Sequence, residues 1–196
     1  MIYAIYSDRP RCGKSTFRQA LTSALAVRDG EYSTEHIPFA DRVKRLTEHI
    51  IDALPISSLS KIAACDNMWQ GDKSYPIMNM TVRQLLQFAG TDLGRNKLHP
   101  DIWVTAWLEE IQPYLRTGTH IVVDDMRFEN EYDMCKSLGA KFIKIINTNA
   151  LQSGHESEGR LSNRHFDYVF DNSAFDMSTL NAFATLFAAS SCQTYE

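Results

Sequence analysis

The chain has few cysteines and lacks the long apolar runs of membrane proteins. Its four cysteines (Cys12, Cys65, Cys135 and Cys192) never form a CxxC pair, so we expect reduced thiols rather than a disulfide framework or a zinc site. No apolar run approaches the roughly 18 residues that span a bilayer. The first residues, interrupted by Arg9, hold too short an apolar stretch for a signal peptide. These absences predict a soluble protein of the cytoplasm.

An excess of positive charge is also missing. The sequence has 20 Lys and Arg against 24 Asp and Glu, which gives a formal net charge of -4 at pH 7. Such a balance provides no global field that would draw the protein onto nucleic acid or anionic lipid. The 196 residues are 44% hydrophobic and 22% charged, so the chain can build the core of one globular domain.

The segment IYSDRPRCGKSTF, residues 5–17, lacks the first glycine of a phosphate-binding loop. In the pattern G-x-x-x-x-G-K-[S/T], backbone N–H groups at a helix start cradle phosphates, the lysine neutralises charge and the hydroxyl binds Mg²⁺. Gly13, Lys14 and Ser15 match this pattern, whereas Asp8 replaces the first glycine. Asp enters left-handed backbone conformations more readily than most residues, so we expect Asp8 to be tolerated, with a cost in phosphate affinity.

The position of the motif favours a nucleotide site over a chance match. Residues 1–7 have the composition of a buried strand and residues 14–27 have helical spacing, so the loop joins a strand to a helix as the motif requires. Arg9 and Arg11 flank Asp8 and either offset its charge or form a solvated surface.

Two carboxylates support the same interpretation. Asp124 and Asp125 end a short apolar run, where phosphate-loop proteins place the acid that holds Mg²⁺. The alternative is an Asp pair that caps the following helix.

Strand patterns alternate with helix patterns along the chain, which predicts a parallel sheet covered on both faces. Residues 55–80 have no regular pattern and are expected to be irregular. Strands are expected at residues 1–7, 36–40, 120–126, 141–148 and 167–172, and helices at residues 14–27, 41–54, 81–97, 101–117, 129–139 and 177–190.

Seven short segments in a fixed order add a resemblance. They are FADRVKRL (39–46), TVRQLLQ (81–87), GTDLGR (90–95), PDIWV (100–104), DMRFENE (125–131), HESE (155–158) and FDYVFDN (166–172). With these segments and the phosphate loop, the chain resembles the phage deoxynucleoside monophosphate kinases. The resemblance implies an α/β, three-layer P-loop kinase fold with a parallel sheet, helices on both faces and a small lid.

The same resemblance implies how one domain of residues 1–196 is organised and what it does. The core would comprise residues 1–54 and 118–196, an acceptor-binding helical insertion about residues 55–117, and the lid about residues 149–165. The implied activity is ATP-dependent phosphorylation of deoxynucleoside 5′-monophosphates with Mg²⁺ as cofactor.

The implied site residues fall into three groups. Donor-binding residues are Arg11, Cys12, Gly13, Lys14, Ser15, Thr16 and Arg160, with Ser15 and Asp125 serving the metal. Acceptor-binding residues are Phe39, Asp41, Lys44, Arg83, Gln87, Thr91, Asp92, Arg95, Trp103 and Arg127. Catalytic residues are Lys14, Arg95, Arg127 and Asp125. For Arg83 and Lys44 a solvated helix position is the alternative, and for Phe39 and Trp103 it is core packing.

Two other functions stay open at this stage. One is a kinase of a hydroxymethylated pyrimidine base in phage DNA, the only interpretation with a nucleic-acid partner. The other is a non-catalytic nucleotide-binding protein whose loop has decayed at Asp8. The leading interpretation has only small nucleotides as partners, in the host cytoplasm if the protein is phage-encoded, and leaves a homodimer open.

Overall fold

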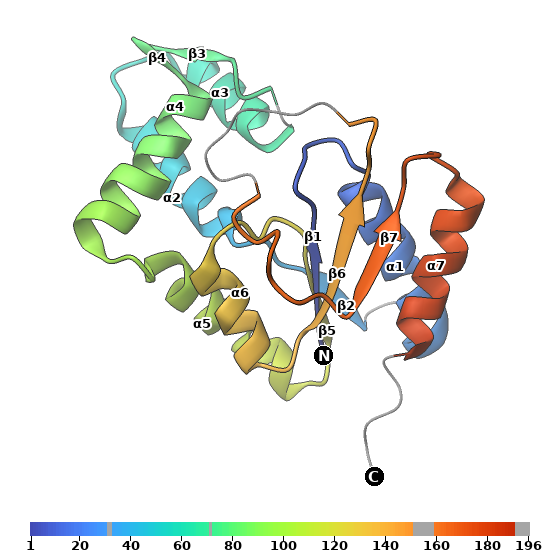
Figure 1. Cartoon of the computed structure of the whole chain (residues 1–196). Coiled ribbons are helices and arrows are strands. Elements are labelled where there is room, and N and C mark those ends of the chain that lie inside the picture. Colours follow the sequence, from blue (N-terminus) through green and yellow to red (C-terminus); the bar gives the residue numbers. More distant parts are fainter. Residues whose placement is uncertain (31–32, 71, 151–158, 191–196) are drawn as a thin grey trace. The chain divides into compact units, whose positions relative to one another are not determined.

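The computed structural model describes residues 1–30, 33–70, 72–150 and 159–190 (Figure 1). The chain divides into two compact units. The sheet unit comprises Met1–Pro38 and Glu110–Glu196, and the helical unit comprises Phe39–Glu109. Each unit is described by itself.

The sheet unit is built on a five-stranded sheet in the order β2-β5-β1-β6-β7, and every neighbouring pair of strands is parallel. Their carboxyl ends therefore meet at one edge, the carboxyl edge. All residues of β1 are buried, as expected of the central strand of a sheet covered on both faces. The strands are β1 (Ile2–Tyr6), β2 (Thr34–His36), β5 (His120–Val123), β6 (Lys141–Ile146) and β7 (Tyr168–Asp171).

Helices cover both faces of this sheet (Figure 1). On one face α1 (Lys14–Asp29) lies beside α7 (Met177–Ser190), and Phe17 packs among Phe170, Phe183 and Phe187 with ring centroids about 6 Å apart. On the other face α6 (Glu129–Ser137) stacks Tyr132 on Phe142 of β6, at 4.5 Å between ring centroids. These contacts confirm the three-layer α/β fold.

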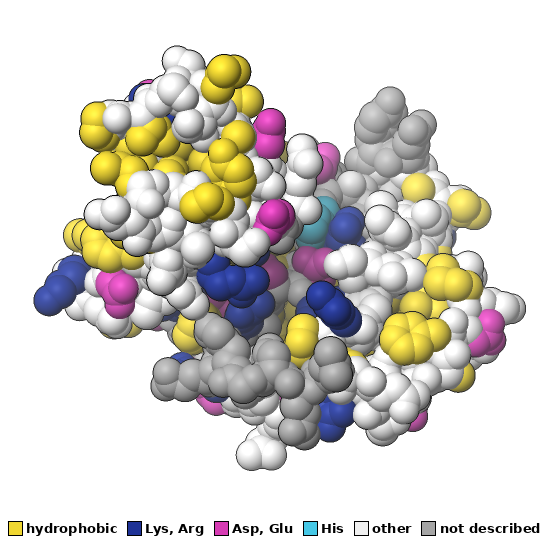
Figure 2. All heavy atoms as spheres, turned by 90° about the horizontal axis from the view of Figure 1, so that it is seen from above, with side chains coloured by type: hydrophobic (Ala, Val, Ile, Leu, Met, Phe, Trp, Pro, Cys, Tyr) yellow, Lys and Arg dark blue, Asp and Glu magenta, His cyan; other side chains and the backbone are white. Residues whose placement is uncertain are grey.

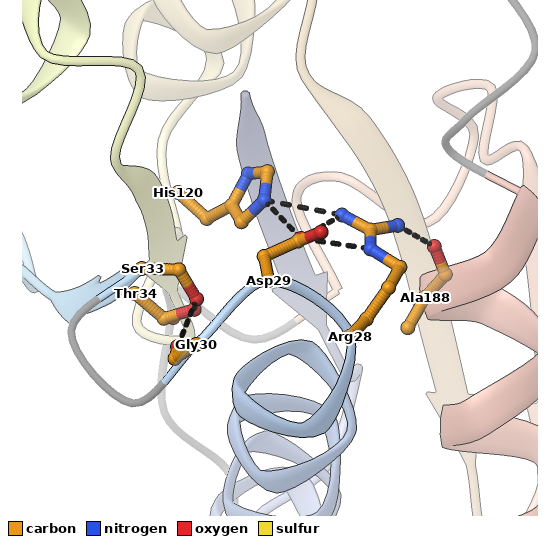
Figure 3. A network of polar contacts seen from close by, with 7 residues as sticks. All are labelled: Arg28, Asp29, Gly30, Ser33, Thr34, His120 and Ala188. Atoms are coloured by element: carbon orange, nitrogen blue, oxygen red, sulfur yellow. Dashed lines mark hydrogen bonds and ion pairs between the residues drawn. The ribbon is translucent and has the colours of Figure 1, made fainter.

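A polar network lies at the opposite edge of the sheet, where β5 begins (Figure 3). Arg28 and Asp29 at the end of α1 form an ion pair, and Asp29 Oδ2 also lies 2.8 Å from His120 Nε2 at the start of β5. Arg28 donates to the carbonyl of Ala188 in α7. The imidazole Nδ1 of His120 is buried without a hydrogen-bond partner among the described residues. The network ties the end of α1 to the first residue of β5 and to the end of α7.

The helical unit has a small core of its own. Ile51, Met68, Val82 and Leu85 are buried together there. Hydrophobic side chains are also exposed on this unit, and Figure 2 shows them on its surface; Leu59 is 80% exposed. Its elements are α2 (Ala40–Ala53), α3 (Ser58–Gln70), β3 (Pro76–Ile77), β4 (Met80–Thr81), α4 (Val82–Gln87), the π-helix η1 (Phe88–Leu98) and the first part of α5 (Ile102–Arg116).

Three of the predicted elements are wrong in this part of the chain. Residues 55–80 are not irregular, because they contain α3 and the β3–β4 hairpin. The strand predicted at residues 36–40 ends at His36, and the apolar residues after it are a buried connection. The helix predicted at residues 81–97 is a short α-helix that continues as a π-helix.

The division between the units also differs from the predicted core boundary at residue 54. Helix α2 belongs to the helical unit, because its buried Ile51 joins the core of that unit. Val43 of α2 likewise packs close to Gly90, where an added Cβ would lie 3.1 Å from a Val43 methyl group.

Candidate nucleotide-binding site

The predicted phosphate loop connects β1 to α1 at the carboxyl edge of the sheet. Gly13 has φ +96°, and a Cβ added there would lie 2.3 Å from Asn172 Nδ2, so both the backbone and the space require glycine. Helix α1 begins at Lys14 without a side-chain cap and without an acidic residue in its first turn. The backbone N–H groups and dipole at such a helix start favour a bound anion.

A cavity of about 310 Å³ opens beside this loop. Its lining includes the loop residues predicted to bind the donor. The segment after β7 and the start of α7 add the apolar side chains of Phe175, Met177 and Leu180. The lining residues are Arg11, Cys12, Gly13, Lys14, Ser15, Thr16, Asn172, Phe175, Met177 and Leu180.

Four of the lining residues were not predicted from the sequence. Asn172 is buried, and its Nδ2 donates to the carbonyl of Cys12 at 2.9 Å, which holds the loop against the end of β7. Phe175, Met177 and Leu180 give the cavity its apolar side chains. The motif FDYVFDN, which ends at Asn172, was the signal in the sequence that could have pointed to this residue. No sequence pattern, however, connects Asn172 to Cys12, which lies 160 positions earlier.

Arg9 has neither of the two roles considered for it. Its Nη1 donates to the backbone carbonyls of Thr148 and Ala150, each at 3.1 Å, and so ties the loop to the end of β6. Arg11 has φ +58° and lines the cavity with an exposed side chain. Of the two flanking arginines, Arg11 is therefore the one placed to meet a ligand.

The backbone of Asp8 is not left-handed, so the reason given for tolerating it is wrong. Instead its carboxylate has two partners: Lys144 Nζ lies 2.6 Å from Oδ2, and Ser162 Oγ donates to Oδ1 at 2.7 Å. Burial alone raises the pKa of Asp8, but the hydrogen bonds from Lys144 and Ser162 outweigh it, and the pKa lies below 3.8. The residues that line the cavity do not include Asp8.

Of the two acidic residues after β5, Asp124 has two basic partners. Asp124 Oδ2 accepts from Arg18 Nε of α1 at 3.1 Å, and its Oδ1 lies 2.8 Å from His36 Nε2. Burial raises the pKa of Asp124, yet the hydrogen bond and charge of His36 and the charge of Arg18 hold it below its ordinary value. Asp124 is thus held as an anion by residues of α1 and β2.

The buried carboxylate of Glu131 holds the backbone of residues 127 and 128, which follow Asp125 and Met126. Glu131 is 3% exposed, and its Oε2 accepts from the backbone N–H groups of Arg127 at 2.6 Å and of Phe128 at 3.0 Å. These bonds fix the backbone of Arg127, whose side chain is exposed, at the start of α6. The Arg160 guanidinium lies over the Phe128 ring, 5.5 Å from its centroid. Arg127, a predicted catalytic residue, therefore directly precedes the residue, Phe128, that Arg160 of the predicted lid contacts.

Residues 151–158 of the predicted lid lie outside the described residues. The part that follows them is held at several points. Leu161 is fully buried, Arg164 pairs with Glu129 and Asp133 of α6, and the Tyr132 hydroxyl donates to the carbonyl of His165 at 2.8 Å.

Several predicted acceptor residues have structural contacts inside the helical unit. Lys44 Nζ lies 3.1 Å from Asp41 Oδ1 and 4.4 Å from the centroid of the Trp69 ring. Phe39 is buried against Trp107, at 4.4 Å between ring centroids. Trp103 is buried too, and its Nε1 donates to the carbonyl of Gly90 at 2.7 Å.

Apart from Arg127 of the sheet unit, the other predicted acceptor residues lie in α4 and η1. A capping box fixes the start of α4, in which Thr81 and Gln84 exchange hydrogen bonds between side chain and backbone. Arg95 is half-buried and donates to the carbonyl of Pro100 at 3.3 Å. Four more of these residues are exposed: Arg83, Gln87, Thr91 and Asp92.

Two kinds of feature are absent from the described part of the chain. No helix in it is long and apolar enough to cross a membrane. No group of three or more His, Cys, Asp and Glu side chains in the same part could hold a metal ion.

Comparisons with known proteins agree with this geometry. The sequence profile of the family described as deoxynucleotide monophosphate kinase matches residues 13–180. A protein of Acanthamoeba polyphaga mimivirus with the provisional name of deoxynucleotide monophosphate kinase is 29% identical over 148 residues. The similar region covers 68% of this chain and 72% of the viral protein.

Proposed function

Since this chain belongs to the deoxynucleotide monophosphate kinase family, we propose that it transfers the γ-phosphate of ATP to the 5′-phosphate of a deoxynucleoside monophosphate. The observation that carries the proposal is the cavity at the start of α1, whose lining combines the loop residues Gly13, Lys14 and Ser15 with the apolar side chains of Phe175 and Met177.

The mixed lining of the cavity suits a nucleoside triphosphate, which has charged phosphates and a flat base. Backbone N–H groups at the start of α1 bind phosphate oxygens, while the Lys14 ammonium offsets their negative charge. The Phe175 ring and the Met177 thioether offer an apolar surface for the flat base. Asn172 holds the loop in shape through the carbonyl of Cys12, so the binding surface exists before the nucleotide arrives.

The Ser15 hydroxyl and the Asp125 carboxylate fit Mg²⁺, because hard cations prefer oxygen ligands. Ser15 belongs to the first turn of α1 and Asp125 follows β5, and the strand preceding Ser15 pairs directly with β5. Bound Mg²⁺ neutralises charge on the donor phosphates. Asp124 contributes indirectly, since it holds Arg18 of α1 and His36 of β2 beside this edge.

Phosphoryl transfer then depends on positioning, since the protein forms no covalent bond to the phosphate. Lys14 stays with the migrating phosphoryl group, and Arg127 and Arg160 of the sheet unit supply planar guanidinium groups for its oxygens. The acceptor monophosphate is assigned to the helical unit, with Arg83 and Arg95 for its phosphate.

A panel of acceptors tests the proposal. Purified protein is incubated with ATP, Mg²⁺ and, in turn, each common deoxynucleoside monophosphate, each ribonucleoside monophosphate, and duplex DNA with or without hydroxymethylated pyrimidines. ADP release is measured. We expect release with one or more deoxynucleoside monophosphates and little with DNA. ADP release only with hydroxymethylated DNA would show instead that the protein is a kinase of modified DNA. If no acceptor stimulates ADP release, the protein would be a non-catalytic nucleotide-binding protein.

The Lys14→Ala variant and a matched control assign the activity to the cavity. Lys14→Ala should abolish most of the release, since it removes a charge that follows the transferring group. Lys136→Ala, which removes an exposed lysine of α6, should behave like the wild type.

A further inference from the structure

Asp8 occupies the first position of the phosphate loop, and its carboxylate is held by two residues that are distant in sequence. Lys144 of β6 lies 2.6 Å from one oxygen. The Oγ of Ser162, in the predicted lid, lies 2.7 Å from both the other oxygen and the carbonyl oxygen of Gly159, and these two acceptors share its single hydroxyl proton. The side chains of Asp8 and Lys144 are 30% and 14% exposed, so this pair is partly withdrawn from water. If the loop had lost its function, we would not expect the Asp8 carboxylate to have these two partners.

The pair of Asp8 and Lys144 lies beside two aromatic rings. The rings of Tyr6 and Phe166 stack with 5.3 Å between their centroids, and Lys144 Nζ lies 5.9 Å and 5.8 Å from them. Burial and the neighbouring Asp8 carboxylate raise the pKa of Tyr6 to about 12, so its hydroxyl stays neutral at physiological pH. The charges in the cluster are thus those of Asp8 and Lys144, and they cancel.

Ser162 connects this cluster to the segment of residues 159–166. Its backbone N–H donates to the carbonyl of Gly159 at 3.0 Å, which closes a turn at the start of the segment. Leu161 is buried beside it, and Arg160 projects from the same turn onto Phe128. A change at Asp8 can therefore reach Arg160 through one hydrogen bond and two peptide units.

We propose that Asp8 is a positioning residue that joins the phosphate loop to residues 159–166 and thereby fixes Arg160 for phosphoryl transfer. The inference rests on the proposed kinase function for its effect on turnover, though not for the contact itself. Asp8 takes the place of glycine because its side chain makes this connection, while Lys144 cancels its charge and so prevents it from repelling the donor phosphates. Arg160 is the group that acts on the substrate, and Asp8 acts through it.

The kinetic test uses Asp8→Ala, Asp8→Gly and Ser162→Ala. Asp8 has no positive φ, so alanine fits its backbone and removes the carboxylate without adding chain freedom. We expect kcat to fall tenfold or more in both Asp8 variants, because a misplaced phosphate-binding group is costly. The KM for ATP should stay the same or fall, because the loop loses a negative charge. Ser137→Ala, which removes an exposed serine hydroxyl of α6, is the matched control and should match the wild type.

A double-mutant cycle separates a connection from two independent effects. If Asp8 acts through Ser162, the variant with both Asp8→Ala and Ser162→Ala should lose no more turnover than Asp8→Ala alone. Additive losses, or a kcat unchanged in Asp8→Ala, would overturn the proposal. So would a rise in the KM for ATP with kcat unchanged, because that result makes Asp8 a donor-binding residue.

Hydrogen exchange in the absence of nucleotide tests the contact without relying on kinase activity. The backbone amides of Ser162 and Arg164, which close the turn, should exchange faster in Asp8→Ala than in the wild type and in Ser137→Ala. Unchanged exchange overturns the connection even if the protein is a kinase. Faster exchange in a protein without any kinase activity would sustain the connection and reject the proposed function instead.

Discussion

Asp124 and Asp125 are neighbours in the sequence, and the structure shows the partners of Asp124. The Asp124 side chain is 12% exposed and is held by Arg18 and His36. Sequence patterns could place both residues at the end of a strand but could not identify these partners, since they come from α1 and β2.

Replacing each carboxylate by its amide should therefore give two different results. Asp124→Asn should lower the free energy of unfolding by about 1–3 kcal/mol, since it leaves a partly buried Arg18 with a weaker partner. Asp125→Asn should change stability less and should raise the Mg²⁺ concentration needed for half-maximal activity. Urea unfolding and a Mg²⁺ titration of turnover measure the two effects. Identical behaviour of the two variants in both experiments contradicts this division of roles.

Among the elements, those with apolar and buried faces were predictable from the sequence and those without them were not. The fully buried β1 and the continuous apolar run of β5 were recognised. Strand β2 consists of Thr, Glu and His at the edge of the sheet and carries no apolar signal. In α3, Leu59 and Ile62 are exposed while Ala64 and Met68 are buried, so its sequence lacks the usual amphipathic stripe.

Gly13 precedes the first residue of α1, and two features of the structure require glycine at this position. Gly13 has φ +96° and ψ 15°, in the left-handed helical region, which costs alanine about 1 kcal/mol. A Cβ at Gly13 would also collide with Asn172. Gly30, at the other end of this helix, has φ +103° and ψ 158°, and a Cβ there would meet nothing within 4 Å.

We expect Gly13→Ala to lower the free energy of unfolding by about 1–3 kcal/mol, measured by urea unfolding, because Asn172 must move. It should also weaken ATP binding, which Gly30→Ala should leave unchanged. An unchanged free energy of unfolding in Gly13→Ala would show that the loop and Asn172 do not pack as described.

On the scale of the whole molecule, the two edges of the sheet have different roles. The carboxyl edge holds the cavity, whereas the other edge holds the network of Arg28, Asp29 and His120 (Figure 3). Neither was predictable in detail from the sequence. Phe175 and Met177 meet the phosphate loop only because β7 lies two strands away from β1, and His120 meets Asp29 across 91 residues.

The network predicts how the stability of the sheet unit depends on pH. Burial lowers the pKa of His120 below its ordinary value of 6.5, although Asp29 partly opposes this. The unfolded chain then binds the proton more tightly than the folded chain, so stability is lost as the pH falls below about 6.5. The Met1 amino group, whose pKa is lowered by burial and by Arg28, acts in the same sense below 8.0. Asp8 and Asp124 have lowered pKa values, so their contribution is lost only below 3.8.

Unfolding in urea from about pH 7.5 to about pH 5.5 isolates His120 when the wild type is compared with His120→Gln. The wild type should lose more stability across this range than the variant, which lacks the imidazole of His120. An equal loss in both proteins would show that His120 is not the responsible group.

The central claim is that the cavity at the start of α1 binds ATP and delivers its γ-phosphate to a deoxynucleoside monophosphate. The most direct measurement follows γ-labelled ATP in the presence of Mg²⁺ and each deoxynucleoside monophosphate, with the wild type, Lys14→Ala and Lys136→Ala. We predict that the label appears in a deoxynucleoside diphosphate, one phosphate for each ADP formed, with the wild type and Lys136→Ala, and at least tenfold more slowly with Lys14→Ala. Label released as free phosphate, or transferred equally fast by Lys14→Ala, would contradict the claim.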